Sequence, residues 1–290
     1  LIVTMPTNMK SIELTDNNRY LHCIKFEPEA EARANIVIAA ALGVKQRFYQ
    51  PIARWLSEQG YRVITFDYYG IGQSVDKPLK HIQSDIIEWA ELDIKTVLDY
   101  AHSCQQNEPL IWLAHSLGGQ IVALAPNSDC IDQMVTIASG TGYWLKASKQ
   151  VRWTSWLLWY FAAPISTPIA GYFPGKRLNM VGDMPAPAMK QWSRWCRSKN
   201  YLFDNITDEQ KARYDAFTAP IRAFHITDDE LLQRSNIEAL LSHYPNAEKS
   251  LTDLTPDMAS SKGIGHFNFF RSRFKESLWR KSLLDALQVN

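Results

Sequence analysis

The sequence predicts an α/β protein with a mostly parallel central sheet and helices on both faces. Short apolar runs of strand length alternate with longer segments of helical periodicity, as in parallel sheets whose strands are joined by helices. The runs lack apolar–polar alternation, which indicates strands buried on both faces. The alternation stops between residues 141 and 217, and 290 residues suit one large domain with an insertion there.

Five runs have the composition of buried strands. Each is short, rich in small or β-branched apolar residues, and bounded by polar or turn-forming residues. The predicted strands are Ala34–Ala41, Tyr61–Phe66, Leu110–Ala114, Ile131–Ala138 and Ile221–Ile226.

Four segments have helical signals. The first ends at Gly60, a residue suited to a helix C-terminus, and the second carries apolar residues along one face. The third is apolar nearly all round and stops at Pro126, which predicts a buried helix. The predicted helices are Arg47–Gln59, His81–Ser103, Gly118–Ala125 and Phe267–Leu287.

The composition changes in the segment 141–217. It holds six of the ten tryptophans and five prolines, and it has little strand signal. We therefore predict a core domain formed by residues 1–140 and 218–290, with residues 141–217 as an inserted helical cap.

Charge and cysteine usage narrow the functional class. The formal net charge is +1 with no basic stripe, so no nucleic-acid partner is expected. The four cysteines form no Cys-x-x-Cys pair and no cluster with histidines, which argues against a metal site or a disulfide framework. Free thiols are typical of a reducing compartment, so we expect a cytoplasmic protein.

No targeting or membrane-spanning segment is expected. The start, Leu1–Pro6, lacks the basic and apolar regions of a signal peptide. The stretch Trp153–Gly175 is uncharged, but its prolines at 164, 168 and 174 would leave carbonyl groups unsatisfied in lipid.

The strongest chemical signal is a serine between a buried strand and a buried helix. Ser116 is flanked two positions away by Ala114 and Gly118, and a strand–turn–helix nucleophile elbow requires small residues at both places. The usual pattern has glycine at the first of them, and alanine is still small. The elbow would expose the serine hydroxyl and direct the amide of Leu117 toward a developing oxyanion.

A serine hydrolase of this kind takes its partners in the order serine, acid, histidine. Asp228 and Asp229 follow the strand Ile221–Ile226, and either carboxylate could orient an imidazole. His266 lies in a glycine-rich loop before a helix, where its ring can reach the nucleophile as general base. The other histidines lie on strands or amphipathic segments or, like His115, within the elbow.

These motifs resemble the α/β-hydrolase superfamily, in the branch of bacterial enzymes related to monoglyceride lipases and serine aminopeptidases. Asp67–Ser74 is similar to the Asp-x-Arg-Gly-x-Gly-x-Ser turn of that branch, with Tyr69 in place of arginine. Ala40–Gly43 occupies the position of the His-Gly-x-Gly oxyanion loop, and the resemblance implies that the Leu42 amide is the second oxyanion donor. It also favours Asp229 over Asp228 as the acid.

The expected activity is acyl transfer to water through an acyl-enzyme, with no metal and no organic cofactor. The substrate is expected to be a small ester or thioester with an apolar acyl or aromatic group, held in part by cap aromatics. An amidase or aminopeptidase is the alternative, with Asp183 or Asp204 holding a substrate amine, and a non-catalytic ligand-binding protein is a second. The cap aromatics expected at the substrate are Trp144, Trp156, Trp159 and Trp192.

Overall fold

The computed structural model describes residues 8–16, 18–105, 107–147, 149–180 and 182–289. The first residues of the chain, for which no signal peptide is expected, lie outside the described ranges. Within those ranges, no helix combines the length and the hydropathy needed to cross a membrane.

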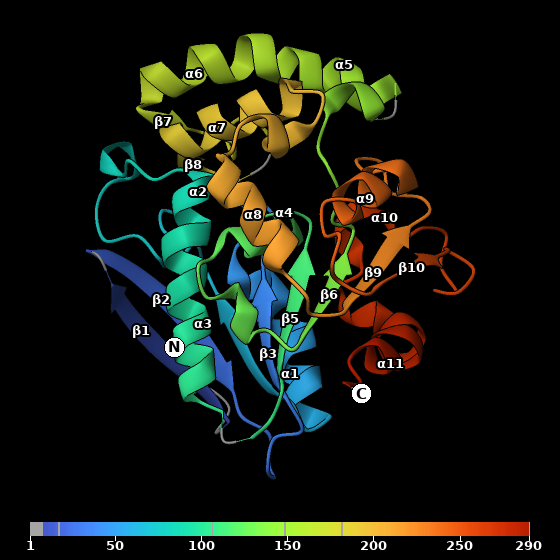
Figure 1. Cartoon of the computed structure of the whole chain (residues 1–290). Coiled ribbons are helices and arrows are strands. Elements are labelled where there is room, and N and C mark those ends of the chain that lie inside the picture. The colour runs from blue at the N-terminus through green and yellow to red at the C-terminus, as the bar shows by residue number, and fades with distance from the viewer. Residues whose placement is uncertain (1–7, 17, 106, 148, 181, 290) are drawn as a thin grey trace.

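A twisted sheet of eight strands forms the centre of the molecule, in the order β1-β2-β4-β3-β5-β6-β9-β10 (Figure 1). The neighbours from β4 to β10 are all parallel, while β1 and β2 join the edge in antiparallel pairs. The predicted fold class is confirmed. The strands are β1 Met9–Asp16, β2 Arg19–Phe26, β3 Asn35–Ala39, β4 Arg62–Phe66, β5 Leu110–His115, β6 Gln133–Ile137, β9 Ile221–Ile226 and β10 Lys249–Leu254.

All five predicted strands are present, as the inner strands β3, β4, β5, β6 and β9. Sequence analysis missed β1, β2 and β10, which lack continuous apolar runs. Half of the residues of β1 and half of those of β10 are exposed. These strands form because the sheet offers them backbone hydrogen-bond partners, which composition alone does not reveal.

Helices cover both faces of the sheet, with α3 in front and α1 behind it in Figure 1. The second predicted helix begins later than expected, because Asp85 caps it with a reciprocal hydrogen-bonded capping box. From there α2, the π-helical η3 and α3 run on without a break. The bounds are η1 Gln46–Tyr49, α1 Gln50–Glu58, η2 Leu79–His81, α2 Ile86–Glu88, η3 Trp89–Ile94 and α3 Lys95–Ser103.

The two remaining predicted helices are each divided. The elbow helix is a single turn followed by a separate 3₁₀ turn, because Gly118 and Gly119 are poor helix formers. The C-terminal segment is also split into short helices. The bounds are α4 Leu117–Gln120, η4 Val122–Leu124, η5 Ser128–Cys130, α9 Arg234–Leu241, α10 Gly265–Asn268, η9 Ser272–Phe274, η10 Lys275–Leu283 and α11 Leu284–Ala286.

The helices α5, α6 and α7 and the strands β7 and β8 lie above the carboxyl ends of the sheet strands, as the top layer of Figure 1. The helix α8 lies lower and contacts η3 and η4 through hydrogen bonds of Arg213 to Glu91 and to the carbonyl of Leu124. Helix α5, the π-helical η7 and α6 follow one another directly, and Pro164 and Pro168 are accommodated within α6. A π-helical turn loosens the hydrogen-bond ladder, which helps a helix to admit proline. The bounds are η6 Trp144–Lys146, α5 Lys149–Leu157, η7 Leu158–Ala162, α6 Ala163–Ala170, β7 Tyr172–Phe173, β8 Met184–Pro185, α7 Ala186–Arg197, η8 Tyr201–Asp204 and α8 Asp208–Ala216.

Candidate active site

Ser116 lies at the junction between β5 and α4, on a strained backbone. Its φ of 50° and ψ of −110° are values that a non-glycine residue rarely adopts. The surrounding structure holds this conformation, since the Ser116 amide donates to the carbonyl of Ile137 at 3.1 Å. Backbone strain of this kind gathers at functional sites.

The residue two positions after Ser116 must be small, because the backbone there lies against β3. A Cβ atom on Gly118 would lie 2.6 Å from the Cβ of Ala39 and 2.7 Å from its carbonyl oxygen. Gly119 is just as close to Ser139, 2.7 Å from its hydroxyl. The glycines therefore allow α4 to pack directly on the sheet, which explains the small residue required two positions after the serine.

Asp229 contacts the ring of His266. The Nδ1 of His266 lies 2.7 Å from Oδ2 of Asp229, and both side chains are almost wholly buried. The other carboxylate oxygen of Asp229 accepts the amides of Leu231 and Leu232 at 2.7 and 3.0 Å. The carboxylate is thus fixed by its own turn and presents one oxygen to the imidazole.

The two acidic neighbours of Asp229 bind the backbone of the same histidine loop. Oδ2 of Asp228 accepts the amide of Ile264 at 2.8 Å, and Oε2 of Glu230 accepts the amide of His266 at 3.2 Å. The Asp228 carboxylate therefore contacts the loop backbone and not the ring. Three consecutive acidic residues hold one loop.

Two residues that sequence analysis did not single out connect the elbow, the loop after β3 and the histidine loop. The hydroxyl of Tyr49 accepts the amide of Ala41 at 2.9 Å and lies 2.8 Å from Nδ1 of His115. Nε2 of His115 donates to the carbonyl oxygen of His266 at 3.0 Å. Since a carbonyl only accepts, Nε2 carries the proton, and Tyr49 donates its own proton to Nδ1.

Burial and the nearby His266 hold the pKa of His115 well below its ordinary value. A neutral ring is also what the hydrogen bonds require, because Nδ1 must accept. The rings of His115 and His266 lie 5.1 Å apart between centroids, so His266 stands beside the residue that precedes Ser116. Tyr49 lies in no recognisable motif, and the elbow motif does not specify the residue type at His115, so only the folded chain reveals their connection.

The loop after β3 carries Leu42, which is buried. Within the described residues, the Leu42 amide donates no hydrogen bond to another group of the protein. The amide of Leu117 is at the start of α4, where no preceding turn of helix can accept it. Both amides that sequence analysis assigned to an oxyanion hole are therefore without an intrahelical or sheet partner.

The turn Asp67–Ser74 supports the loop after β3. Oδ1 of Asp67 accepts the amide of Gln46 at 2.7 Å, and Oδ2 accepts the amide of Gln73 at 2.9 Å. Ser74 closes the turn by donating to the carbonyl of Asp67 at 2.6 Å. Gly72 has a φ of +57°, and a Cβ there would lie 2.1 Å from the Asp67 carboxylate, so only glycine fits.

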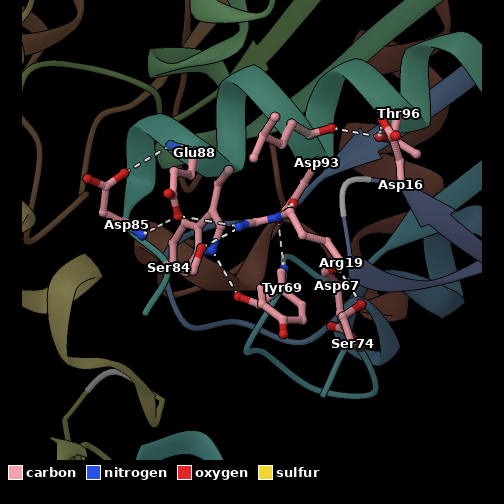
Figure 2. Close-up of polar contacts among 12 residues, drawn as sticks. Asp16, Arg19, Asp67, Tyr69, Ser74, Ser84, Asp85, Glu88, Asp93 and Thr96 are labelled. Carbon is pink, nitrogen blue, oxygen red and sulfur yellow. Dashed lines mark hydrogen bonds and ion pairs between the residues drawn. The ribbon is translucent and has the colours of Figure 1, made fainter. Parts of the chain in front are cut away.

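A buried ion pair holds the same turn from the other side (Figure 2). Nε of Arg19 donates to Asp93 at 2.7 Å, and the second oxygen of Asp93 accepts the amide of Tyr69 at 2.8 Å. The guanidinium of Arg19 also bonds Ser84 and lies over the Tyr69 ring, 4.6 Å from its centroid. Burial raises the pKa of Asp93 to about 6, although Arg19 opposes the shift.

The four tryptophans predicted at the substrate occupy different environments. Trp159 is buried and packs edge-on against Trp192 at 4.7 Å between ring centroids. Trp192 and Trp144 are partly buried against the core. Trp156 is partly exposed and stacks on the exposed Trp153, with 5.2 Å between the ring centroids.

Comparison with solved structures shows the fold. An α/β serine hydrolase homologue from Coxiella burnetii is 13% identical, with 98% of this chain and 99% of that chain covered and a TM-score of 0.58. An esterase from Pyrococcus furiosus is 15% identical, with 96% of this chain and 89% of that chain covered and a TM-score of 0.60. This chain therefore has the α/β-hydrolase fold.

Comparison of sequences identifies the family. A curated protein of Yersinia enterocolitica named "Putative carbamate hydrolase RutD" is 33% identical over 113 residues, and this alignment covers 37% of each chain. The family model described as "Serine aminopeptidase, S33" matches residues 30–180, slightly more than half of the chain, including the loop after β3, the turn and the elbow. This chain belongs to that family of α/β hydrolases.

Proposed function

We propose that this protein is a serine hydrolase that cleaves a carboxylic ester or thioester, with Ser116, His266 and Asp229 as its catalytic triad. The observation that carries the proposal is the contact of 2.7 Å between His266 and Asp229, beside an elbow that holds Ser116 in a strained conformation. An imidazole oriented by a buried carboxylate is the general base that a serine nucleophile needs.

Each group would have a separate task in this mechanism. With Nδ1 of His266 donating to Asp229, Nε2 is left to accept the hydroxyl proton of Ser116 as its oxygen attacks the substrate carbonyl. The amides of Leu117 and Leu42 would bind the oxyanion. His266 then protonates the departing alcohol or thiol. Water, activated by the same nitrogen, breaks the acyl–serine bond and releases the acid and the free enzyme.

Residues 141–217 would form the cap that selects the substrate. Trp159 and Trp192 pack where η7 meets α7, and Trp144 follows the short link from β6. Apolar and aromatic walls with few polar groups suit an ester with an apolar acyl or aromatic part. The curated relative and the solved neighbours described above, named as hydrolases or an esterase, are consistent with this choice.

An ester is favoured over an amine-bearing peptide because the two acidic cap residues proposed as amine anchors have other contacts. Asp183 pairs with Lys176 at 3.2 Å and accepts its amide. Asp204 accepts both the amide and the side chain of Asn200. Both carboxylates therefore already have hydrogen-bond or ion-pair partners within the protein, which disfavours either as the anchor of a substrate amine.

The proposal is tested with chromogenic esters of graded acyl length and the matching anilides. We expect esters to be hydrolysed and anilides to react far more slowly. Ser116→Ala should lower ester turnover on the order of a thousandfold. Ser103→Ala, at an exposed serine near the end of α3, is the matched control and should keep full activity. Ester turnover that survives in folded Ser116→Ala would rule the mechanism out, and faster hydrolysis of the anilides than of the esters would favour the amidase alternative.

A further inference from the structure

The helix formed by α5, η7 and α6 has a row of exposed apolar side chains along its outer side. The row repeats every fourth residue, and this spacing places side chains on one face of a helix. All five are exposed to solvent, most of all near the C-terminal end. They are Trp153 at 64%, Leu157 at 40%, Phe161 at 48%, Ile165 at 58% and Ile169 at 82% exposure.

Exposed apolar side chains are concentrated in this part of the chain. Of the twelve large apolar residues that are exposed within the described ranges, nine lie between residues 145 and 180. Single exposed apolar residues are ordinary on a protein surface, but a contiguous group of them marks a site of contact. The other four members are Leu145, Tyr160, Leu178 and Met180.

The inner side of the same helix is apolar as well. Leu158, Trp159 and Ala163 are buried in the core, and Trp159 packs on Trp192 of α7. A helix that is apolar all round normally has a partner on every side. Here the inner side packs on α7, and the outer side faces away from the rest of the chain as the outermost layer in Figure 1.

The segment that carries this outer face has basic residues and no acidic ones. Between Asp132 and Asp183 the sequence has no acidic residue, but it has five lysines and arginines, of which Lys176 pairs with Asp183. From α7, Arg197 adds a further cation, with its guanidinium 5.7 Å from the centroid of the Tyr160 ring. A surface that is apolar, aromatic and cationic complements a negatively charged apolar phase.

We propose that the outer face of α5, η7 and α6 rests on the surface of a bilayer that contains anionic lipids. Trp153 and Tyr160 suit the headgroup level, because their rings are apolar with a polar edge. Ile165 and Ile169 would enter the acyl region, and Arg152 and Arg197 would meet lipid phosphates. A protein partner is disfavoured because the helix is an outward ridge without the acidic residues of a mixed polar rim.

The inference rests on this face and not on the proposed hydrolysis, so its test measures binding. Vesicles of phosphatidylcholine alone, and of phosphatidylcholine with phosphatidylglycerol, are floated with the full chain. We expect the chain to float with the mixed vesicles, less with the neutral ones, and less in high salt. Tryptophan emission should shift to the blue as Trp153 leaves water.

The variant Ile165→Asp/Ile169→Asp should weaken partitioning into mixed vesicles on the order of tenfold or more. Met258→Asp is the control, because Met258 is 44% exposed at a turn distant in sequence and gains the same type of charge. It should bind like the unmodified chain. Urea unfolding of each variant establishes that it is folded, which the exposure of both isoleucines predicts.

Three results would overturn the proposal. The first is that the unmodified chain floats with neither type of vesicle. The second is equal binding by the isoleucine variant and the Met258 control. The third is a dimer that the isoleucine substitutions dissociate, without any vesicle binding, since the face would then join two copies of the chain.

Discussion

The three consecutive acidic residues 228–230 make different contacts with the loop that carries His266. Asp229 contacts the ring of His266, while Asp228 and Glu230 accept amides from the same loop. Adjacent side chains on the turn diverge, so only one of them can reach the imidazole. The other two fix the backbone that carries it.

Asp229→Asn should lower ester turnover on the order of a thousandfold, because an amide neither holds the imidazole in the same tautomer nor stabilises its cation. Asp228→Asn is the matched variant. Its side-chain oxygen can still accept the amide of Ile264, so the loss should be much smaller. The measurement is kcat for one ester across both variants. The reverse order of effects would assign the acid to Asp228.

His115 gives the fold a pH dependence. Its pKa is lowered by burial in the native state, whereas an unfolded histidine titrates near pH ~6.5. As the pH falls below that value, the unfolded chain binds a proton that the native chain does not, so the native state loses stability.

The free energy of unfolding of the unmodified chain, relative to His115→Gln, should therefore shrink between about pH 8 and about pH 5. Urea unfolding at both pH values measures it, and taking the difference cancels other titrating groups. His102→Gln, at an exposed position of α3, is the control and should show no such trend. A constant difference for His115→Gln would mean that His115 is not held neutral.

At the scale of elements, sequence patterns predicted the strands that are buried on both faces of the sheet. They missed the strands whose formation depends on pairing with a neighbouring strand. The parallel strands β3, β4, β5, β6 and β9 are mostly apolar, so their runs are readable in the sequence. The strands β1, β2 and β10 are not, because polar residues interrupt them and they depend on pairing with neighbouring strands. The elbow helix was predicted too long, since the glycines that allow close packing also weaken the helix.

The candidate site divides in the same way. Ser116, Asp229 and His266 could be named as candidates because their motifs are local and the expected order along the chain is fixed. The hydrogen bonds from Ala41 through Tyr49 and His115 to the His266 carbonyl could not, because they join three segments far apart in the sequence. Arg19, which lies over Tyr69, has no local signal either.

The effects of substituting Arg19 and Asp93 on the free energy of unfolding should not be additive. Arg19→Met leaves a buried carboxylate without its cation and should cost about 3–5 kcal/mol of stability. Asp93→Asn keeps an acceptor for the Tyr69 amide, and Arg19→Met/Asp93→Asn should be less destabilised than Arg19→Met alone.

Urea unfolding of the two single variants and the double variant measures this coupling. The exposed pair Arg280 and Glu276 is the control, and its removal should change stability little. Strictly additive losses for Arg19 and Asp93 would show that the two side chains act independently in holding the turn.

At the scale of the whole molecule, the candidate catalytic residues follow strands of the sheet, and α5, α6 and α7 lie above the carboxyl ends of those strands (Figure 1). If the segment 141–217 selects the substrate, Trp192→Ala should change the ratio of kcat/KM between long-chain and short-chain esters. It should leave the reaction of Ser116 with a small fluorophosphonate near normal. An equal loss on both esters together with lost labelling would mean that the segment supports the catalytic centre itself.

The central claim is that Ser116 is a nucleophile activated by His266. The most direct measurement is the reaction of the full chain with a fluorophosphonate, followed by mass analysis of its peptides, because only an activated serine reacts. The account predicts a single modified residue, Ser116, with labelling that is lost in His266→Ala. Labelling at another serine, or none in the folded chain, would contradict it.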